Sequence, residues 1–147
     1  MKRRVAWCVI GLALVLGACE TIPIASSSST GAIPSTSLNL GDWRRANANL
    51  VAQHFEREVG GRYGAGLALT AVSSDLRRNE FTCAPNRDDA GRGDPPEQIC
   101  RKTITVEGCT HTWQVHLYDV DGNEALARAR ALYDRRCGGE GLLGGPG

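Results

Sequence analysis

The chain has 147 residues, 22% of them charged, and a formal net charge of +1 at pH 7. Three of its 17 Lys and Arg residues and none of its 16 Asp and Glu residues lie in the first 18 positions, so the remainder has a net charge near −2. That balance excludes the basic footprint by which proteins bind nucleic acid. The remainder is long enough for one domain and too short for two.

The N-terminal segment has the three parts of a secretory signal. Basic residues at 2–4 precede an uncharged apolar run over 5–16, which is too short to span a bilayer comfortably, and small residues follow. The run ends in Leu-Gly-Ala-Cys at 16–19, which resembles the lipobox of bacterial lipoproteins at every position. The resemblance implies that residues 1–18 are removed as a signal peptide and that Cys19 is acylated, palmitate being a typical chain, so that a lipid anchor holds the protein to a membrane.

The residue after the cysteine bears on which membrane holds the anchor. In lipoproteins an aspartate there favours the inner membrane and most other residues permit sorting outward, so Glu20 implies the periplasmic side of the outer membrane, with the inner membrane as the alternative. An ordinary signal peptide that ends by chance in a cysteine is a further alternative. Residues 19–40 are rich in Ser, Thr and Pro, which predicts a flexible lipidated tether.

Two helices are predicted next. Apolar residues recur at helical spacing from Trp43, so we expect a helix over 42–59, capped by Asp42 and ended by Gly60-Gly61. Residues 67–79 fit a strand or a helix. Asn79 tolerates the left-handed conformation that ends helices, and the apolar Phe81 beyond it favours the helix.

Three short strands are predicted over 81–84, 99–107 and 110–118, with a polar loop over 85–96 and a turn at Gly108. Alternation along the third strand divides its side chains between two faces. His111, Trp113, Val115 and Leu117 share one face, and Thr112, Gln114, His116 and Tyr118 share the other.

A helix over 123–136 is predicted to close the domain, because Ala125, Leu126, Ala129 and Leu132 form an apolar stripe at helical spacing. The tail over 138–147 is expected to be disordered. The predicted domain, 41–137, is therefore α+β with two layers: two N-terminal helices, a three-stranded antiparallel meander and a C-terminal helix.

Four cysteines remain after Cys8 leaves with the signal and Cys19 is acylated. An even number in an oxidising compartment predicts two disulfides. Of the three possible pairings we favour the one in which each bond ties neighbouring elements. A metal site is the alternative, and the absence of a C-x-x-C pair argues against it. The favoured pairs are Cys83–Cys100 and Cys109–Cys137.

Residue patterns that carry chemistry are missing from the sequence. Ser73 and Ser74 are the only serines in the predicted domain, and the sequence shows no base that would activate either of them as a nucleophile. His111 and His116 point to opposite faces of one strand, so they cannot share a metal ion. The segment 119–124 starts like a calcium loop, but its glycine is at the fourth position instead of the sixth. We therefore predict a protein that is not an enzyme and holds no cofactor or metal.

The element order over residues 42–118, two helices leading into a three-stranded meander on a lipidated tether, resembles the small lipoprotein subunit of the outer-membrane β-barrel assembly machine. The resemblance implies a binding or scaffold module in envelope assembly or integrity, with another envelope protein as partner. Such modules present a sheet face or edge. The candidate contacts are Gln114, His116 and Tyr118 on the sheet, with Arg87, Asp88, Asp89, Arg92 and Asp94 in the loop.

The alternative function is a lipoprotein inhibitor that blocks an incoming hydrolase such as lysozyme. The residues between Cys83 and Cys100 would then form a rigid inhibitory loop, which loses little entropy on binding.

Overall fold

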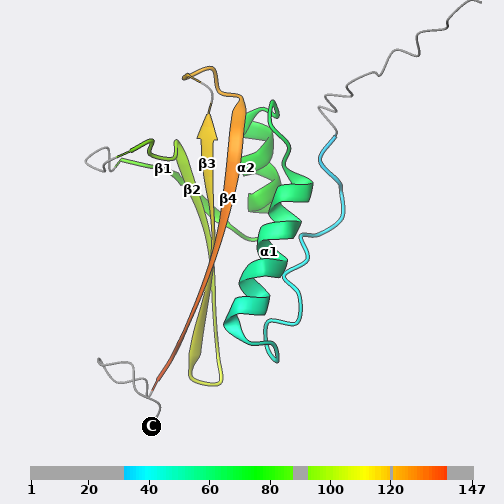
Figure 1. The fold of residues 1–147 in the computed structure, drawn as a ribbon, viewed down its shortest axis with the longest axis vertical. Coiled ribbons are helices and arrows are strands. Elements are labelled where there is room, and N and C mark those ends of the chain that lie inside the picture. Colours follow the sequence, from blue (N-terminus) through cyan, green and yellow to red (C-terminus); the bar gives the residue numbers. More distant parts are fainter. Residues whose placement is uncertain (1–31, 88–92, 120, 139–147) are drawn as a thin grey trace, which may run out of the picture.

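A computed structural model describes residues 32–87, 93–119 and 121–138. In that part of the chain, two helices cover one face of a four-stranded antiparallel sheet of order β1-β2-β3-β4, so the α+β class and the two-layer arrangement are confirmed (Figure 1). The signal segment, Cys19 and most of the predicted tail lie outside the described residues. The elements are α1 Ala48–Arg62, α2 Leu69–Arg78, β1 Thr82–Pro85, β2 Gln98–Val106, β3 Cys109–Asp119 and β4 Leu126–Cys137.

The predicted C-terminal helix is wrong, because the segment forms strand β4. β4 pairs with β3 along its whole length, with Ala131 opposite Val115. Ala, Leu and Arg favour helices locally, but this preference is small beside tertiary packing. Alanines 129 and 131 alternate with arginines 128 and 130, and the two alanines pack toward the core. The period-2 pattern therefore prevailed over the helical stripe.

Helix α1 is displaced from its predicted bounds. Asp42 heads a separate turn, in which its carbonyl accepts the N–H groups of the third and fourth residues after it. The cap of α1 is Asn47, whose side chain accepts the N–H of Leu50 at 3.0 Å. The helix runs through Gly60-Gly61 to Arg62, because Val59 and Tyr63 on either side of the glycines are buried in the core.

Helix α2 ends at Asn79 as predicted, although a different residue takes the left-handed conformation. Asn79 has φ −91°, while Glu80 has φ 67°. The Phe81 N–H then donates to the Leu76 carbonyl at 3.0 Å, and the Phe81 side chain is buried, which completes the expected return of the chain onto the helix.

The domain begins earlier than the predicted position 41. Residues 32–40 form an arm that packs on the helix layer, where the Leu38 side chain is buried and its N–H donates to the Asn79 side chain at 2.7 Å. Arg62 donates to the carbonyls of Pro34 and Thr36 at 2.8 and 2.7 Å. Residues 32–40, predicted as part of the tether, therefore belong to the domain.

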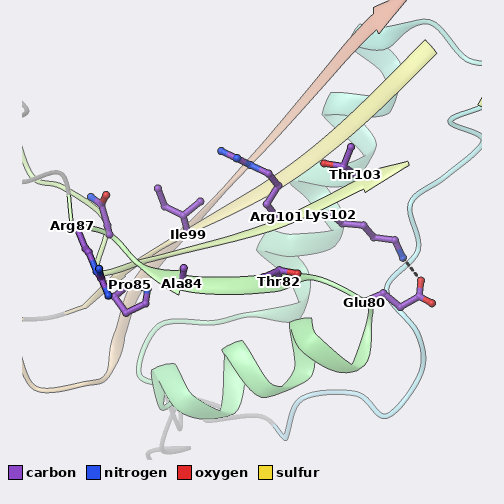
Figure 2. Close-up of a pocket in the computed structure, with 10 residues that line it drawn as sticks. Glu80, Thr82, Ala84, Pro85, Arg87, Ile99, Arg101, Lys102 and Thr103 are labelled. Carbon is purple, nitrogen blue, oxygen red and sulfur yellow. Dashed lines mark hydrogen bonds and ion pairs between the residues drawn. The ribbon is translucent and has the colours of Figure 1, made fainter. Parts of the chain in front are cut away.

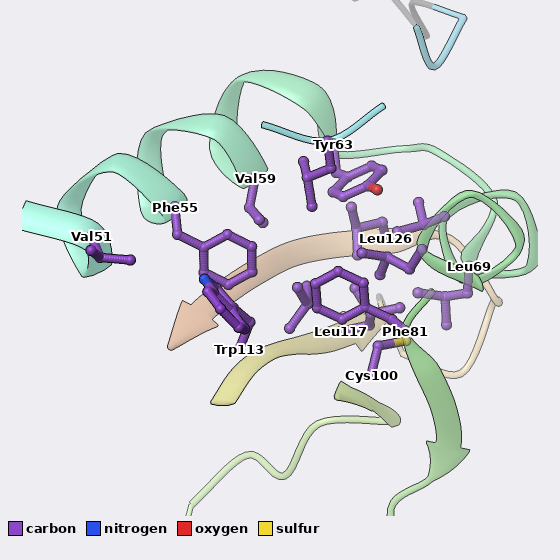
Figure 3. Packing of buried hydrophobic residues seen from close by; sticks show 14 of the residues in the cluster. Val51, Phe55, Val59, Tyr63, Leu69, Phe81, Cys100, Trp113, Leu117 and Leu126 are labelled. Carbon is purple, nitrogen blue, oxygen red and sulfur yellow. The ribbon is translucent and has the colours of Figure 1, made fainter. Parts of the chain in front are cut away.

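The core lies between the helices and the sheet (Figure 3). As predicted, alternate residues of β3 face it, and Trp113 is fully buried at its centre. Both predicted disulfides are present, and each joins residues directly opposite each other on adjacent strands. The bonds are Cys83–Cys100 between β1 and β2, and Cys109–Cys137 between β3 and β4.

Candidate functional site

The face of the sheet that the helices do not cover is the candidate binding surface; we call it the open face. Ile99, Arg101 and Thr103 project from one side of β2, away from α2 (Figure 2). Alternation places their cross-strand partners on β3 and β4 on the same face. These partners are Thr112, Gln114 and His116 on β3, and Arg130, Leu132 and Asp134 on β4.

A polar cluster occupies the centre of the open face. Arg101 lies opposite Gln114, and His116 lies opposite Arg130. The Gln114 side-chain oxygen accepts from the Arg101 guanidinium at 3.4 Å and lies 3.3 Å from Nε2 of His116. We call these four residues the arginine cluster.

The electrostatics of the cluster are positive. Burial lowers the pKa of His116, and the nearby charges of Arg130 and Arg101 lower it further, because a second positive charge there is unfavourable. The imidazole is therefore predominantly neutral at pH 7. Among the described residues, no carboxylate lies within ion-pair distance of Arg101 or Arg130.

Arginines at the border of the open face are paired, unlike those of the arginine cluster. Arg128 contacts Asp94 at 3.4 Å, and Arg136 contacts Asp134 at 2.9 Å. Arg101 and Arg130 are therefore the arginines that the strands carry on this face and whose charge no described carboxylate neutralises.

Two hollows flank Arg101. The larger, of about 780 Å³, lies over β1 and β2, with Thr82, Ala84 and Ile99 among its lining residues and Arg87 at one end (Figure 2). The smaller, of about 330 Å³, extends from Arg101 across β3 to β4. A volume of this size can take one or a few side chains of a partner.

The residues predicted as sheet contacts divide into two groups. Gln114 and His116 lie side by side on the open face. Tyr118 belongs to the same face but is only 6% exposed, because the Arg128 guanidinium lies 3.7 Å above its ring. The expectation that Tyr118 is an exposed contact is therefore wrong.

The loop residues predicted as contacts reach the same face where the structure describes them. Arg87 lines the larger hollow, and Asp94 pairs with Arg128 beside Tyr118. Asp88, Asp89 and Arg92 lie outside the described residues. The described loop residues and the predicted sheet residues thus border one surface, although the sequence treats them as alternatives.

Arg101 and Arg130 are absent from the residues predicted as contacts. Arg130 lies in the segment interpreted as a helix, so its place beside His116 was not foreseeable. Arg101 precedes Thr103 and Thr105 in strict alternation, which indicates a polar face on β2 and could have identified it.

A second charged group, inside the domain, serves the fold. Asp75 is 1% exposed, and its two oxygens accept four hydrogen bonds from Arg62, Tyr63 and Arg78. Burial by itself raises the pKa of Asp75, but these hydrogen bonds outweigh it and hold the pKa below its ordinary value. Because both oxygens are fully engaged, this carboxylate has no lone pair to offer a substrate.

Catalytic and metal chemistry have no visible site in the described part of the chain. The Ser73 hydroxyl is buried and donates to the Thr70 carbonyl, and His111 is paired with the Tyr133 hydroxyl at 2.7 Å. In residues 32–87, 93–119 and 121–138, no three His, Cys, Asp or Glu side chains are grouped to hold a metal ion.

No helix of these segments is long and apolar enough to cross a membrane.

Comparison with protein-family models, with curated proteins and with solved structures finds no match for this chain. Function must therefore be inferred from the site, because a fold by itself does not specify one.

Proposed function

We propose that this protein is a lipid-anchored lipoprotein on the periplasmic side of the outer membrane, and that it binds another envelope protein through the open face. The observation that carries the proposal is the uncovered sheet face, with two arginines that no described carboxylate neutralises. Side chains on such a surface are available to a partner, and arginine is enriched at protein interfaces. A binding role, without catalysis, is part of the proposal.

The anchor and the compartment are supported by different features. The Leu-Gly-Ala-Cys segment at 16–19 supports acylation of Cys19. The two disulfides favour, weakly, an oxidising compartment outside the cytoplasm. Two helices followed by an antiparallel meander agree with the element order of the β-barrel assembly lipoprotein, which supports a role in envelope assembly or integrity.

Photocrosslinking in intact cells tests the binding role. A photoreactive amino acid at Gln114 or Thr112 samples the open face, and one at Arg57 on α1 samples the helix layer as the matched control. We expect specific adducts with resident envelope proteins from the open-face positions and none from the control position. Equal adducts from both layers, or none from either, would contradict the proposal.

The anchor requires its own test. Full-length protein should incorporate radiolabelled palmitate, and Cys19→Ser should abolish incorporation and release the protein from membranes. Retention of label in the Cys19→Ser variant would remove the anchor from the proposal.

A second function, inhibition of an incoming hydrolase, is favoured by one observation. The Cys83–Cys100 bond closes the base of the 86–97 loop, as a rigid inhibitory loop requires. Under this second function the protein inhibits lysozyme, and deletion of residues 86–94 should abolish the inhibition while open-face crosslinks persist. Loss of the crosslinks alone would instead assign the loop to the envelope partner.

A further inference from the structure

The arginine cluster has a chemistry that narrows the partner. Arg101 on β2 and Arg130 on β4 lie on either side of strand β3, which places Gln114 and His116 between them. The positive charges of both guanidinium groups lower the pKa of His116, so all three side chains lie close enough to interact electrostatically. Two cations with no described carboxylate within ion-pair distance flank an amide and an imidazole, and negative charge is attracted to such a site.

We propose that the arginine cluster binds carboxylate groups of an acidic polypeptide segment of the partner. The inference rests on the proposed function and specifies the partner surface that this function needs. Planar guanidinium forks and a side-chain amide match the planar carboxylates of Asp and Glu, to which each can donate one or two hydrogen bonds.

The composition of the open face favours a polypeptide over a membrane or a glycan. Among the described residues, the exposed large apolar side chain is Leu50, which lies on α1 in the other layer. Ile99 and Leu132 on the open face are half-buried, so this face presents little apolar surface to insert into a bilayer. The Tyr118 ring of this face is covered by Arg128, and no other Phe, Tyr or Trp lies among the described residues of the open face, so a sugar has no such ring on which to stack.

Phosphate is also disfavoured as the ligand. Phosphate sites usually include backbone N–H groups at a helix terminus or in a concave nest. At the cluster, β3 is hydrogen-bonded on both sides by β2 and β4, so its N–H groups are already used. Only side chains remain to bind the anion.

The position of the arm agrees with a protein partner. Residues 32–40 reach the domain along the helix layer, and the open face lies on the other side of the sheet (Figure 1). If Cys19 is anchored, the chain arrives from the membrane at the helix layer. The arginine cluster is then on the side of the domain away from the entry of the chain, where a periplasmic segment can reach it.

NMR titration of the full-length protein in non-ionic detergent tests the inference, with poly-L-glutamate as the carboxylate probe. Bound carboxylates favour the charged imidazole, so the pKa of His116 should rise. His54, which lies on α1 and contacts the Asn39 carbonyl, is the internal control, and its NMR signals should not move when poly-L-glutamate is added. Sodium phosphate and phosphatidylglycerol vesicles are run in parallel and should leave His116 nearly unchanged.

Paired substitutions locate the binding. Arg101→Gln with Arg130→Gln should weaken poly-L-glutamate binding about tenfold or more. Arg57→Gln with Arg77→Gln removes the same charge from exposed positions of the helix layer and should leave the affinity within about twofold. Arg101→Lys with Arg130→Lys, which keeps the charge and loses the planar fork, should lie between the two.

Each opposing result has a defined meaning. Equal affinity of the two glutamine pairs, or a His116 pKa that moves with phosphate or vesicles and not with poly-L-glutamate, would overturn the inference. If open-face crosslinks persist in cells while poly-L-glutamate fails to bind, only the carboxylate chemistry is rejected. If the crosslinks themselves are missing, the proposed function fails.

Discussion

Asp75 is a buried carboxylate that accepts four side-chain hydrogen bonds. It joins α2 to the end of α1, and through Arg62 to the carbonyls of the arm. Both the Arg62 and the Asp75 side chains are nearly inaccessible to solvent. Breaking such a pair is costly, because the remaining charge stays buried without a partner.

Asp75→Asn should therefore lower the free energy of unfolding by about 3 kcal/mol. Asparagine keeps the size of the side chain but loses the charge that Arg62 needs. Urea unfolding of the variant and of the exposed control Asp42→Asn measures the difference. A loss no larger than that of the control would mean that the ion pair contributes little.

The Asp75 carboxylate should also contribute to the pH dependence of the free energy of unfolding. The pKa of Asp75 is lowered in the folded state, so the folded protein binds fewer protons there than the unfolded chain. Its contribution is present above the unfolded pKa of about 3.9 and is lost as the pH falls through the folded value. Unfolding at a series of pH values should show stability falling below about pH 4, with a shallower fall in Asp75→Asn. Parallel curves would assign acid lability to other groups.

Among the elements, β4 shows where local pattern and tertiary structure disagree. In the helix predicted over 123–136, Leu132 would face the core and Ala131 would face solvent. In the observed strand the two residues have the reverse arrangement. Ala131 packs toward the core, and Leu132 lies opposite Gln114 on the open face.

The two positions therefore respond differently to lysine. Ala131→Lys should destabilise the fold by about 2 kcal/mol or more, because a long charged side chain must enter a packed layer. Leu132→Lys should change stability by less than about 1 kcal/mol. Thermal unfolding of both variants decides between the strand and the helix, since a helix over 123–136 predicts the opposite order.

The disulfides act on the same sheet. Replacing Cys109 and Cys137 with serine frees the end of β4 and should cost about 3 kcal/mol, as should replacement of Cys83 and Cys100. Denaturant unfolding of each double variant against the oxidised protein measures the cost. Unchanged stability in both variants would show that packing alone holds the strands.

In the whole molecule, the arm changes the extent of the domain. Ile33 and Leu38 pack on the core, and Arg62 holds the intervening backbone. A deletion of residues 20–31 should leave the Tm within about 2 °C, while a deletion of residues 20–40 should lower it by about 5 °C or more, because it exposes buried apolar surface. Equal Tm values for both deletions would show that residues 32–40 do not stabilise the domain and belong to the tether, as the sequence predicted.

The sequence predicted much of the fold and half of the candidate site. Alternation along β3 was sufficient to separate the buried Trp113 from the outward Gln114 and His116, because a strand has a strict period of two. It was not sufficient for Tyr118, which has the right parity but is covered by Arg128 from the neighbouring strand. Alternation along a strand determines which face of the sheet a side chain lies on, whereas the neighbouring side chains determine how much of it is exposed to solvent.

Local and covalent features were determined by the sequence alone. These include the lipobox-like segment, the exit of α2 at Asn79, the order of the first five elements and the pairing of the four cysteines, all of which depend on residues close in the chain or on adjacent elements. The tertiary structure decided that 126–137 is a strand, that residues 32–40 belong to the domain, and that Arg130 joins Arg101 beside His116. These depend on contacts between distant residues, whose free energy exceeds the small local preferences that a sequence displays.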